Sequence, residues 1–213
     1  MPTSNQRDKT GQDTRARILE TAKRLFLHAG YHNVSMRTLA KEAGLSTGPL
    51  YFHFQNKSEV FYAICSEGLD LLQAEVARAA AAPLPNALRL REIFLAFQHF
   101  YTREPLYSQI IRMSFNPMSG IDFTDRQREA LFAKKLAYMR SMEEVIRDGI
   151  GKGELQNIDP IRFMLVLYAL GDGIFNANEM GDLQYFGITV EELINEASRL
   201  TYTGIVRNHG GDE

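Results

Sequence analysis

The chain has 213 residues and a formal net charge of -2, with 45% hydrophobic and 23% charged residues. This length can fold as one large or two small domains, and no apolar run approaches the roughly 20 residues that a membrane helix needs. The N-terminal residues lack the apolar stretch of a secretory signal, and Cys65, the single cysteine, excludes an internal disulfide. We therefore expect a protein of the reducing cytoplasm with no membrane contact.

The charges are unevenly distributed along the chain. Residues 1–58 contain nine Lys or Arg and four Asp or Glu, whereas the remainder is acidic overall. A basic segment joined to an acidic one indicates that only the N-terminal segment meets a polyanion such as DNA. Chance clustering on a solvated surface would give the same balance, so the charge pattern alone does not decide.

Capping signals divide the basic segment into short helices. Apolar residues recur at helical spacing up to Gly30, which supplies a C-terminal stop for the first helix. Ser35 is a suitable N-cap for a second helix that ends at Gly44. Ser46 is the expected cap of a third, in which Pro49 lies in the first turn, where the N–H that proline lacks is unpaired anyway.

The spacing of Ala40, Gly44 and Leu50 is typical of a helix-turn-helix. A small residue lets the two helices cross closely, a glycine makes the turn, and an apolar residue fills the angle between them. Asn56 and Glu59 are spaced as a capping box that opens a fourth helix. The segment 1–58 is thus predicted to be a three-helix DNA-binding domain.

Residues from about Arg15 to Tyr62 resemble the DNA-binding head of the tetracycline-repressor-like (TetR) family of bacterial transcriptional regulators. The residues that carry the resemblance are Ala40, Gly44, Leu45, Ser46, Gly48, Leu50, Tyr51, Phe54 and Lys57. It implies that the third helix enters the major groove and that Tyr51 and Lys57 hold phosphates. Thr47 stands where relatives often have lysine, so the operator sequence does not follow from the resemblance.

The predicted DNA-binding residues come from the second and third helices and the start of the fourth. They are Arg37, Thr38, Ser46, Thr47, Gly48, Pro49, Tyr51, His53 and Lys57. Leu50 and Phe54, four residues apart, are expected on the inner face of the third helix, which turns Tyr51 and His53 outward. Phe52 is ambiguous, Tyr51 could be an ordinary surface tyrosine, and His53 could contact a phosphate, read a base or lie at the rim.

The remaining residues, 59–213, are predicted to form a helical effector-binding and dimerisation domain, joined to the head by a long fourth helix. The fold class is all-α, with about nine helices in total. Caps and breakers define the expected boundaries: Pro83, Pro85, Pro105, the Thr124–Gln127 box, the glycines at 149, 151 and 153, Asp159-Pro160 and the Thr189–Glu192 box.

Aromatic and polar residues on the fifth to eighth helices predict an adaptable apolar cavity for a small-molecule effector. The candidate residues are Phe97, Tyr101, Tyr107, Arg112, Phe115, Tyr138 and Tyr168. Ordinary core packing is the more frequent explanation of any one of them. Arg112 has three open roles, since it can reach water, pair with an acid such as Glu104 or Asp122, or receive an anionic ligand.

The last helix carries an apolar stripe spaced by three and four residues, and the eighth carries small residues that allow close approach. In the family that the chain resembles, the last two long helices pair with those of a second subunit as a four-helix bundle. The resemblance therefore implies a homodimer held by Gly171, Leu193, Ile194, Ala197 and Leu200.

Enzyme function finds little support in the sequence. His28 and His32 have the spacing of a metal pair, but Gly30 lies between them at the expected helix end and no third ligand is near. Cys65 has no histidine at a fixed spacing and is expected to be a packing residue. We expect no catalytic residue, no metal and no cofactor.

The sequence thus favours a homodimeric, ligand-responsive repressor that leaves an inverted-repeat operator when a small molecule binds its C-terminal domain. Its expected partners are double-stranded DNA, an effector of unknown identity and a second copy of itself. The alternatives are an activator, a regulator that answers to protein signals, and a helical ligand carrier or enzyme with a vestigial head. Loss of DNA binding at low salt would favour the carrier.

Overall fold

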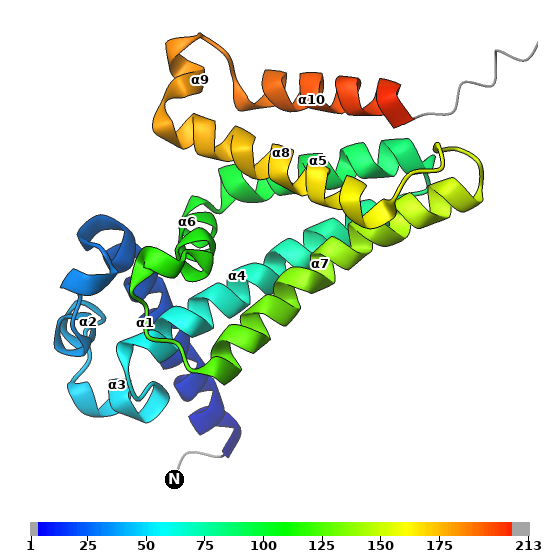
Figure 1. The fold of residues 1–213 in the computed structure, drawn as a ribbon. Coiled ribbons are helices and arrows are strands. Elements are labelled where there is room, and N and C mark those ends of the chain that lie inside the picture. The colour runs from blue at the N-terminus through cyan, green and yellow to red at the C-terminus, as the bar shows by residue number, and fades with distance from the viewer. Residues whose placement is uncertain (1–3, 206–213) are drawn as a thin grey trace, which may run out of the picture. The chain divides into compact units, whose positions relative to one another are not determined.

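The computed structural model describes the backbone of residues 4–205 and the side chains of residues 11–201, 203 and 204. Over this range the chain forms ten α-helices and two short 3-10 helices, with no strand (Figure 1). The elements are α1 (Ser4–Ala29), η1 (Tyr31–Asn33), α2 (Met36–Glu42), α3 (Thr47–His53), α4 (Lys57–Ala80), α5 (Asn86–Arg103), α6 (Pro105–Phe115), η2 (Pro117–Ser119), α7 (Asp125–Gly151), α8 (Pro160–Met180), α9 (Asp182–Tyr185) and α10 (Val190–Ile205). The predicted all-α class is confirmed, and the one additional α-helix is the single turn α9.

The chain divides into two compact units. Unit 1 comprises residues 1–69 and 105–132, and unit 2 comprises residues 70–104 and 133–213. Unit 1 thus takes in α6 and the α6–α7 connection as well as the N-terminal helices, while α4 and α7 contribute residues to both units. The predicted boundary after residue 58 separates a DNA-binding domain from an effector-binding and dimerisation domain. It divides the chain by function and not by compactness, and it stays a prediction.

The capping signals in the sequence correspond to real caps. Ser35 Oγ accepts a hydrogen bond from the backbone N–H of Thr38 at 3.0 Å. Thr189 and Glu192 form the expected box, since the N–H of each donates to the side chain of the other at 2.8 and 3.1 Å. Ser46 occupies the N-cap position of α3, but its side chain makes no capping hydrogen bond. Local chemistry therefore fixes most helix boundaries.

The core of unit 1 is a cluster of aromatic rings under the helix-turn-helix. The ring of Tyr31 lies 5.4 Å from that of Phe26 and 5.1 Å from that of Phe61, centroid to centroid. Phe123, from the α6–α7 connection, lies 6.1 Å from Phe61. Rings from segments far apart in the sequence thus hold the N-terminal helices together.

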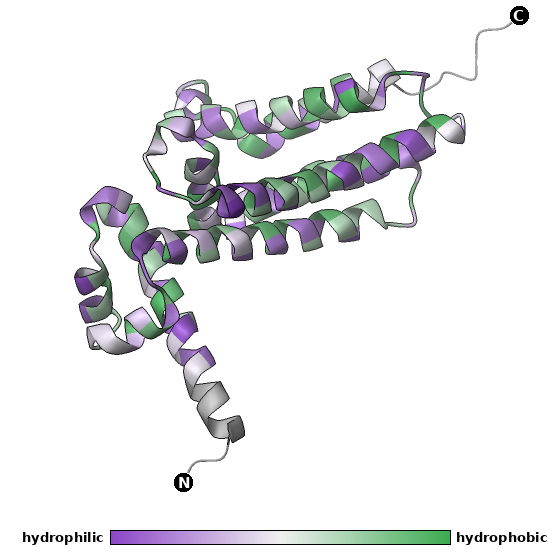
Figure 2. Cartoon of the chain, turned by 60° about the horizontal axis from the view of Figure 1, so that its bottom comes forward, coloured by the Kyte–Doolittle hydropathy of each residue, from purple (hydrophilic) through white to green (hydrophobic). Residues whose placement is uncertain are grey.

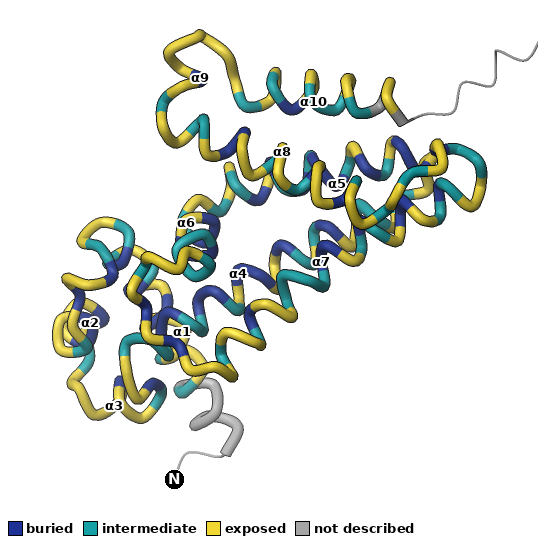
Figure 3. Tube along the Cα trace, in the orientation of Figure 1, coloured by how far each residue is buried: buried dark blue, intermediate teal, exposed yellow. Residues whose placement is uncertain are grey.

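Apolar and polar residues alternate along the long helices (Figure 2), and the buried positions recur on one side of each (Figure 3).

Unit 2 is built around contacts of α5 with α8 and of α10 with both. Ile93, Phe94, Leu167, Ile174 and Ile194 supply buried side chains from these three helices. No helix within the described residues is long and apolar enough to cross a membrane.

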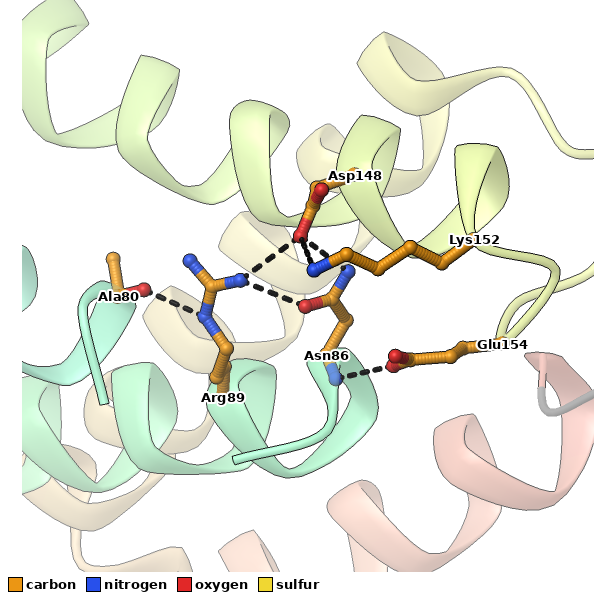
Figure 4. A network of polar contacts seen from close by, with 6 residues as sticks. All are labelled: Ala80, Asn86, Arg89, Asp148, Lys152 and Glu154. Carbon is orange, nitrogen blue, oxygen red and sulfur yellow. Dashed lines mark hydrogen bonds and ion pairs between the residues drawn. The ribbon is translucent and has the colours of Figure 1, made fainter. Parts of the chain in front are cut away.

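A polar network fastens the start of α5 to the end of α7 (Figure 4). Asp148 Oδ2 accepts hydrogen bonds from Asn86 Nδ2 at 3.0 Å and from Arg89 Nη1 at 3.1 Å. Arg89 Nε also donates to the carbonyl oxygen of Ala80 at 2.6 Å, and the N–H of Asn86 donates to Glu154 Oε2 at 2.6 Å. Hydrogen bonds from Lys152 and Asn86 hold the pKa of Asp148 below its usual value.

Replacing Asn86 by alanine should destabilise the protein by about 1–3 kcal/mol, because Asn86 is buried and both ends of its amide have partners in this network. Chemical denaturation measures the change. Arg147→Ala is the control, since Arg147 pairs with Glu143 on the exposed surface of α7 and its loss should cost less than about 0.5 kcal/mol. Equal effects of the two substitutions would mean that the network contributes nothing beyond a surface ion pair.

Candidate nucleic-acid interface and candidate ligand site

Helix α3 has one buried face and one exposed face, as the sequence predicts. Leu50 is fully buried and Phe54 nearly so, whereas Tyr51 is 51% exposed and Phe52 is 84% exposed. The turn before α3 depends on Gly44, whose φ of 63° lies in the left-handed region that favours glycine. Phe52, whose position the sequence left ambiguous, therefore lies at the surface.

The predicted DNA-binding residues lie at the surface of the head. Seven are exposed and two, His53 and Lys57, are half-buried. The exposed ones are Arg37, Thr38, Ser46, Thr47, Gly48, Pro49 and Tyr51. A side chain added at Gly48 would meet no atom within 4 Å, so the backbone of α3 is uncovered there. Such a bare backbone can approach another molecule closely.

Lys57 has an internal role that the sequence did not indicate. Its Nζ donates a hydrogen bond to the carbonyl oxygen of Tyr31 at 2.6 Å and lies 4.2 Å from the centroid of the Tyr31 ring. Burial lowers the pKa of Lys57 below its usual value. The lysine therefore fastens the start of α4 to η1, and its predicted contact with a phosphate would add to that role.

Tyr107, one of the predicted effector residues, joins three helices of unit 1. Its hydroxyl donates to Glu67 Oε1 of α4 at 2.6 Å and accepts from Lys23 Nζ of α1 at 3.1 Å. Its ring lies so close to Gly68 that a Cβ there would come within 2.8 Å of Tyr107 Cδ1. Tyr107 therefore has a packing role on α6.

The structure does not bring the seven predicted effector residues into one group. Tyr107, Arg112 and Phe115 lie on α6 in unit 1, whereas the other four belong to unit 2. Those four, Phe97, Tyr101, Tyr138 and Tyr168, line one cavity of about 30 Å³, together with Phe94, Met142, Leu167, Gly171, Asp172 and Phe175. We call this the aromatic cavity. It is the candidate ligand site.

The rings of the aromatic cavity are in direct contact. Tyr101 and Phe175 are stacked, with centroids 4.0 Å apart and ring planes at 7°. Phe97 and Tyr138 meet edge to face at 5.4 Å. Burial raises the pKa of Tyr138, which therefore remains a neutral phenol. Such a site is suited to apolar or aromatic groups rather than to an unaccompanied charge.

Sequence reasoning missed a second hollow in unit 2, which we call the open hollow. It has a volume of about 290 Å³, and residues of α5, α8 and α10 line it. They are Ala87, Leu88, Leu90, Arg91, Phe94, Phe163, Leu167, Asn195, Ser198, Arg199, Thr201 and Thr203. Its only sequence signal is polar residues on one side of an amphipathic last helix, a pattern that surface helices share.

The predicted dimer residues have mixed environments. Ile194 is buried within its own chain, and Gly171 is half-buried and lines the aromatic cavity. Leu193 and Ala197 are half-buried, and Leu200 is 57% exposed. Five further large apolar side chains on α8 are exposed: Ile161, Leu165, Val166, Leu170 and Met180.

The candidates for enzymatic chemistry do not assemble. Cys65 is fully buried, and burial raises its pKa to about 12, so that the thiol is inert near neutral pH. This matches its expected packing role. Within the described residues, no three side chains of His, Cys, Asp or Glu are grouped as metal ligands.

Comparison with known proteins agrees with the helix-turn-helix. Residues 18–64 match the family model described as bacterial regulatory proteins, tetR family. An HTH-type transcriptional regulator of Staphylococcus aureus (strain USA300) is 41% identical over 63 residues. The N-terminal head, residues 18–64, therefore belongs to the TetR family of DNA-binding domains. The resemblance stated from the motif is thereby confirmed.

The two kinds of similarity cover different parts of the chain. The Staphylococcus match spans 30% of the chain and only 34% of that relative. A regulatory protein in the tetR family from Rhodococcus RHA1 has the same fold, with a TM-score of 0.71 and 17% identity over 89% of this chain and 95% of that one. AibR, solved with isovaleryl coenzyme A and operator DNA, has a TM-score of 0.69 and 23% identity over 88% of this chain and 97% of that one. At these identities the structural likeness shows the fold alone.

The stability of the protein should fall at alkaline pH because of Tyr107. Burial and the hydrogen bond to Glu67 raise the pKa of Tyr107 to about 12, whereas a phenol in an unfolded chain titrates near about 10. Folding therefore favours the protonated phenol, and this stabilisation is lost as the pH rises from about 10 towards 12.

In denaturation experiments at a series of pH values, the wild-type protein should lose stability more steeply over this window than Tyr107→Phe. Tyr185→Phe is the control, because Tyr185 is 85% exposed and makes no such buried contact. Parallel curves for wild type and Tyr107→Phe would contradict the raised pKa.

Proposed function

We propose that this TetR-family regulator is a repressor that binds an inverted-repeat operator through α3 and releases it when a small molecule binds unit 2. The observation that carries the proposal is the geometry of α3. Leu50 and Phe54 are buried, while Thr47, Gly48 and Tyr51 are exposed in the basic part of the chain. This is the arrangement in which a recognition helix presents its outer face to the major groove.

The DNA-binding role rests on charge as well as on shape. Residues 1–58 carry the excess of Lys and Arg, and Arg37, Thr38 and the exposed residues of α3 offer donors for phosphates and bases. An uncovered glycine, Gly48, lets the backbone of α3 come close to the groove. These features favour a functional head over a vestigial one.

The ligand-binding role rests on the aromatic cavity. A mostly apolar cavity with a few polar groups is the usual form of a small-molecule site. A protein of the same fold, AibR, was solved with both isovaleryl coenzyme A and operator DNA. We extend the pairing of ligand and operator to this chain as a proposal, without its particular ligand.

The homodimer is proposed from exposed apolar residues of α8 and α10, which a second copy would cover. Leu200 and Leu165 are examples, each about half exposed in the single chain. A two-fold dimer with two heads selects an inverted repeat whose half-site centres lie about 34 to 36 Å apart, or a multiple of that distance.

Tyr51→Phe should weaken binding to all duplexes alike, by roughly 1 kcal/mol or about fivefold, because a phosphate contact carries no sequence information. The change removes one exposed hydroxyl and should leave the fold intact. Fluorescence anisotropy with a duplex selected from a random pool, and with its scrambled version, measures both affinities at several salt concentrations.

Tyr185→Phe, the same chemical change at an exposed tyrosine of α9, is the control and should bind as wild type does. Unchanged affinity of Tyr51→Phe would remove Tyr51 from the interface. If the wild-type protein bound no duplex even at low salt, the vestigial head would be the correct interpretation.

Leu200→Glu should give monomers that have lost specific DNA binding, since a buried unpaired carboxylate at a dimer interface is strongly unfavourable. Sedimentation at micromolar concentration measures the assembly state. Leu71→Glu places the same charge on α4, where Leu71 is 42% exposed, and should leave the dimer intact. A wild-type monomer under these conditions would refute the proposed assembly.

A further inference from the structure

We infer that the ligand of unit 2 is an amphipathic anion, with its head in the open hollow and its apolar tail in the aromatic cavity. The inference rests on the proposed function, because it names the chemical class of the molecule that would regulate DNA binding. Three observations carry it: the two spaces share a wall, arginine side chains line the outer one, and a lysine already lies over a ring of the inner one.

The shared wall consists of Phe94 and Leu167, which line both the open hollow and the aromatic cavity. Both side chains are buried, so they separate the two spaces in this structure. Gly171 lies behind this wall, and the nearest atom to a Cβ built there is Phe94 Cε1 at 3.8 Å. The missing side chain at Gly171 leaves the edge of the Phe94 ring uncovered, which gives that ring room to turn.

The two spaces differ in size and in chemistry. The open hollow measures about 290 Å³ and the aromatic cavity about 30 Å³, so the inner space is about a tenth of the size of the outer one. Six rings line the inner space, from Phe94, Phe97, Tyr101, Tyr138, Tyr168 and Phe175. A flexible tail that enters between Phe94 and Leu167 would be surrounded by apolar surface.

The open hollow offers groups that suit a negatively charged head. Arg91 and Arg199 both border it, and a guanidinium donates to a carboxylate or phosphate through a two-pronged set of N–H groups. Each arginine has an acidic neighbour: Arg199 pairs with Glu196 at 2.5 Å and Arg91 with Glu92 at 3.4 Å. Both pairs are largely exposed to water, where ion pairs contribute little, so an anionic head can compete for the guanidinium groups.

Ser198 supplies an independent sign of a missing partner. It lines the open hollow beside Arg199, and its Oγ is buried with no hydrogen-bond partner among the described residues. A buried hydroxyl without a partner is uncommon because it has given up hydration without replacement. After a small rotation of the serine side chain, the Ser198 hydroxyl could donate a hydrogen bond to an acceptor oxygen on the head of a ligand.

A cationic ligand is the main competitor, because aromatic rings attract cations and Asp172 also lines the aromatic cavity. However, the ammonium of Lys135 already lies 4.7 Å from the centroid of the Tyr168 ring. A second cation would be repelled by this charge. The position of Lys135 therefore disfavours a cationic group in the aromatic cavity.

The test uses the full-length protein and three matched probe series. Straight-chain alkanoates from butanoate to hexadecanoate are compared with the alcohol and the trimethylammonium of the same chain length, below their micelle concentrations, by titration calorimetry. At the best chain length the carboxylate should bind at least about tenfold tighter than the alcohol, as charge-assisted hydrogen bonds predict. The trimethylammonium should bind more weakly than the alcohol.

Variants separate the head site from the tail site. Arg199→Gln and Arg91→Gln should reduce the preference for the carboxylate over the alcohol while leaving the affinity for the alcohol unchanged. Gly171→Leu fills the space beside Phe94 and should abolish binding of both, with circular dichroism and the thermal midpoint as checks on folding. Arg78→Gln is the control, since Arg78 lies on α4 and does not line the open hollow.

The outcomes distinguish this inference from the proposed function. Tighter binding of the trimethylammonium, or no preference for the carboxylate at any chain length, would overturn the anionic ligand even if the protein still bound its operator. A carboxylate that binds as expected but leaves operator affinity unchanged would uphold the ligand class and refute its role as the regulatory signal.

Discussion

The burial of two side chains, Leu50 and Phe54, is the constraint on which the proposed DNA-binding surface depends. Helix α3 has only seven residues, and isolated helices of that length are not stable in water. Its geometry must therefore come from packing, and the face toward the core is held by Leu50 within the helix and by Phe54 at its C-cap, both of which are buried. Because this face of α3 packs against the core, the neighbouring side chain of Tyr51 points towards the surface. The proposed recognition surface is thus a consequence of the core beneath it.

The same dependence extends to the elements that support the head. Tyr31 and Phe61 belong to the ring cluster, and Lys57 ties the start of α4 to η1 through the Tyr31 carbonyl. Tyr107 adds a polar link, because its hydroxyl bridges Lys23 of α1 and Glu67 of α4. Helix α6 is therefore part of the support of unit 1. A substitution there can change DNA binding without touching DNA.

The sequence predicted those features that depend on neighbouring residues. The cap at Ser35, the turn at Gly44 and the two faces of α3 each require residues within a few positions of one another, so local chemistry suffices. The roles of Lys57 and Tyr107 were missed because their partners lie 26 and 84 residues away. The predicted effector set was divided for the same reason: composition identifies aromatic helices, but only the fold decides which rings meet.

The proposed ligand site has a physical route to the head through the chain itself. Helices α4 and α7 each contribute residues to both compact units, and a helix transmits displacement because its backbone hydrogen bonds make it stiff. In the proposed regulator, a ligand that enters between Phe94 and Leu167 displaces side chains of α5 or α8, and α7 supplies Tyr138 to the same cavity. The ligand acts only to the extent that it binds the DNA-incompetent arrangement better. A coupling of about 1–3 kcal/mol corresponds to a roughly 5- to 150-fold change in operator affinity.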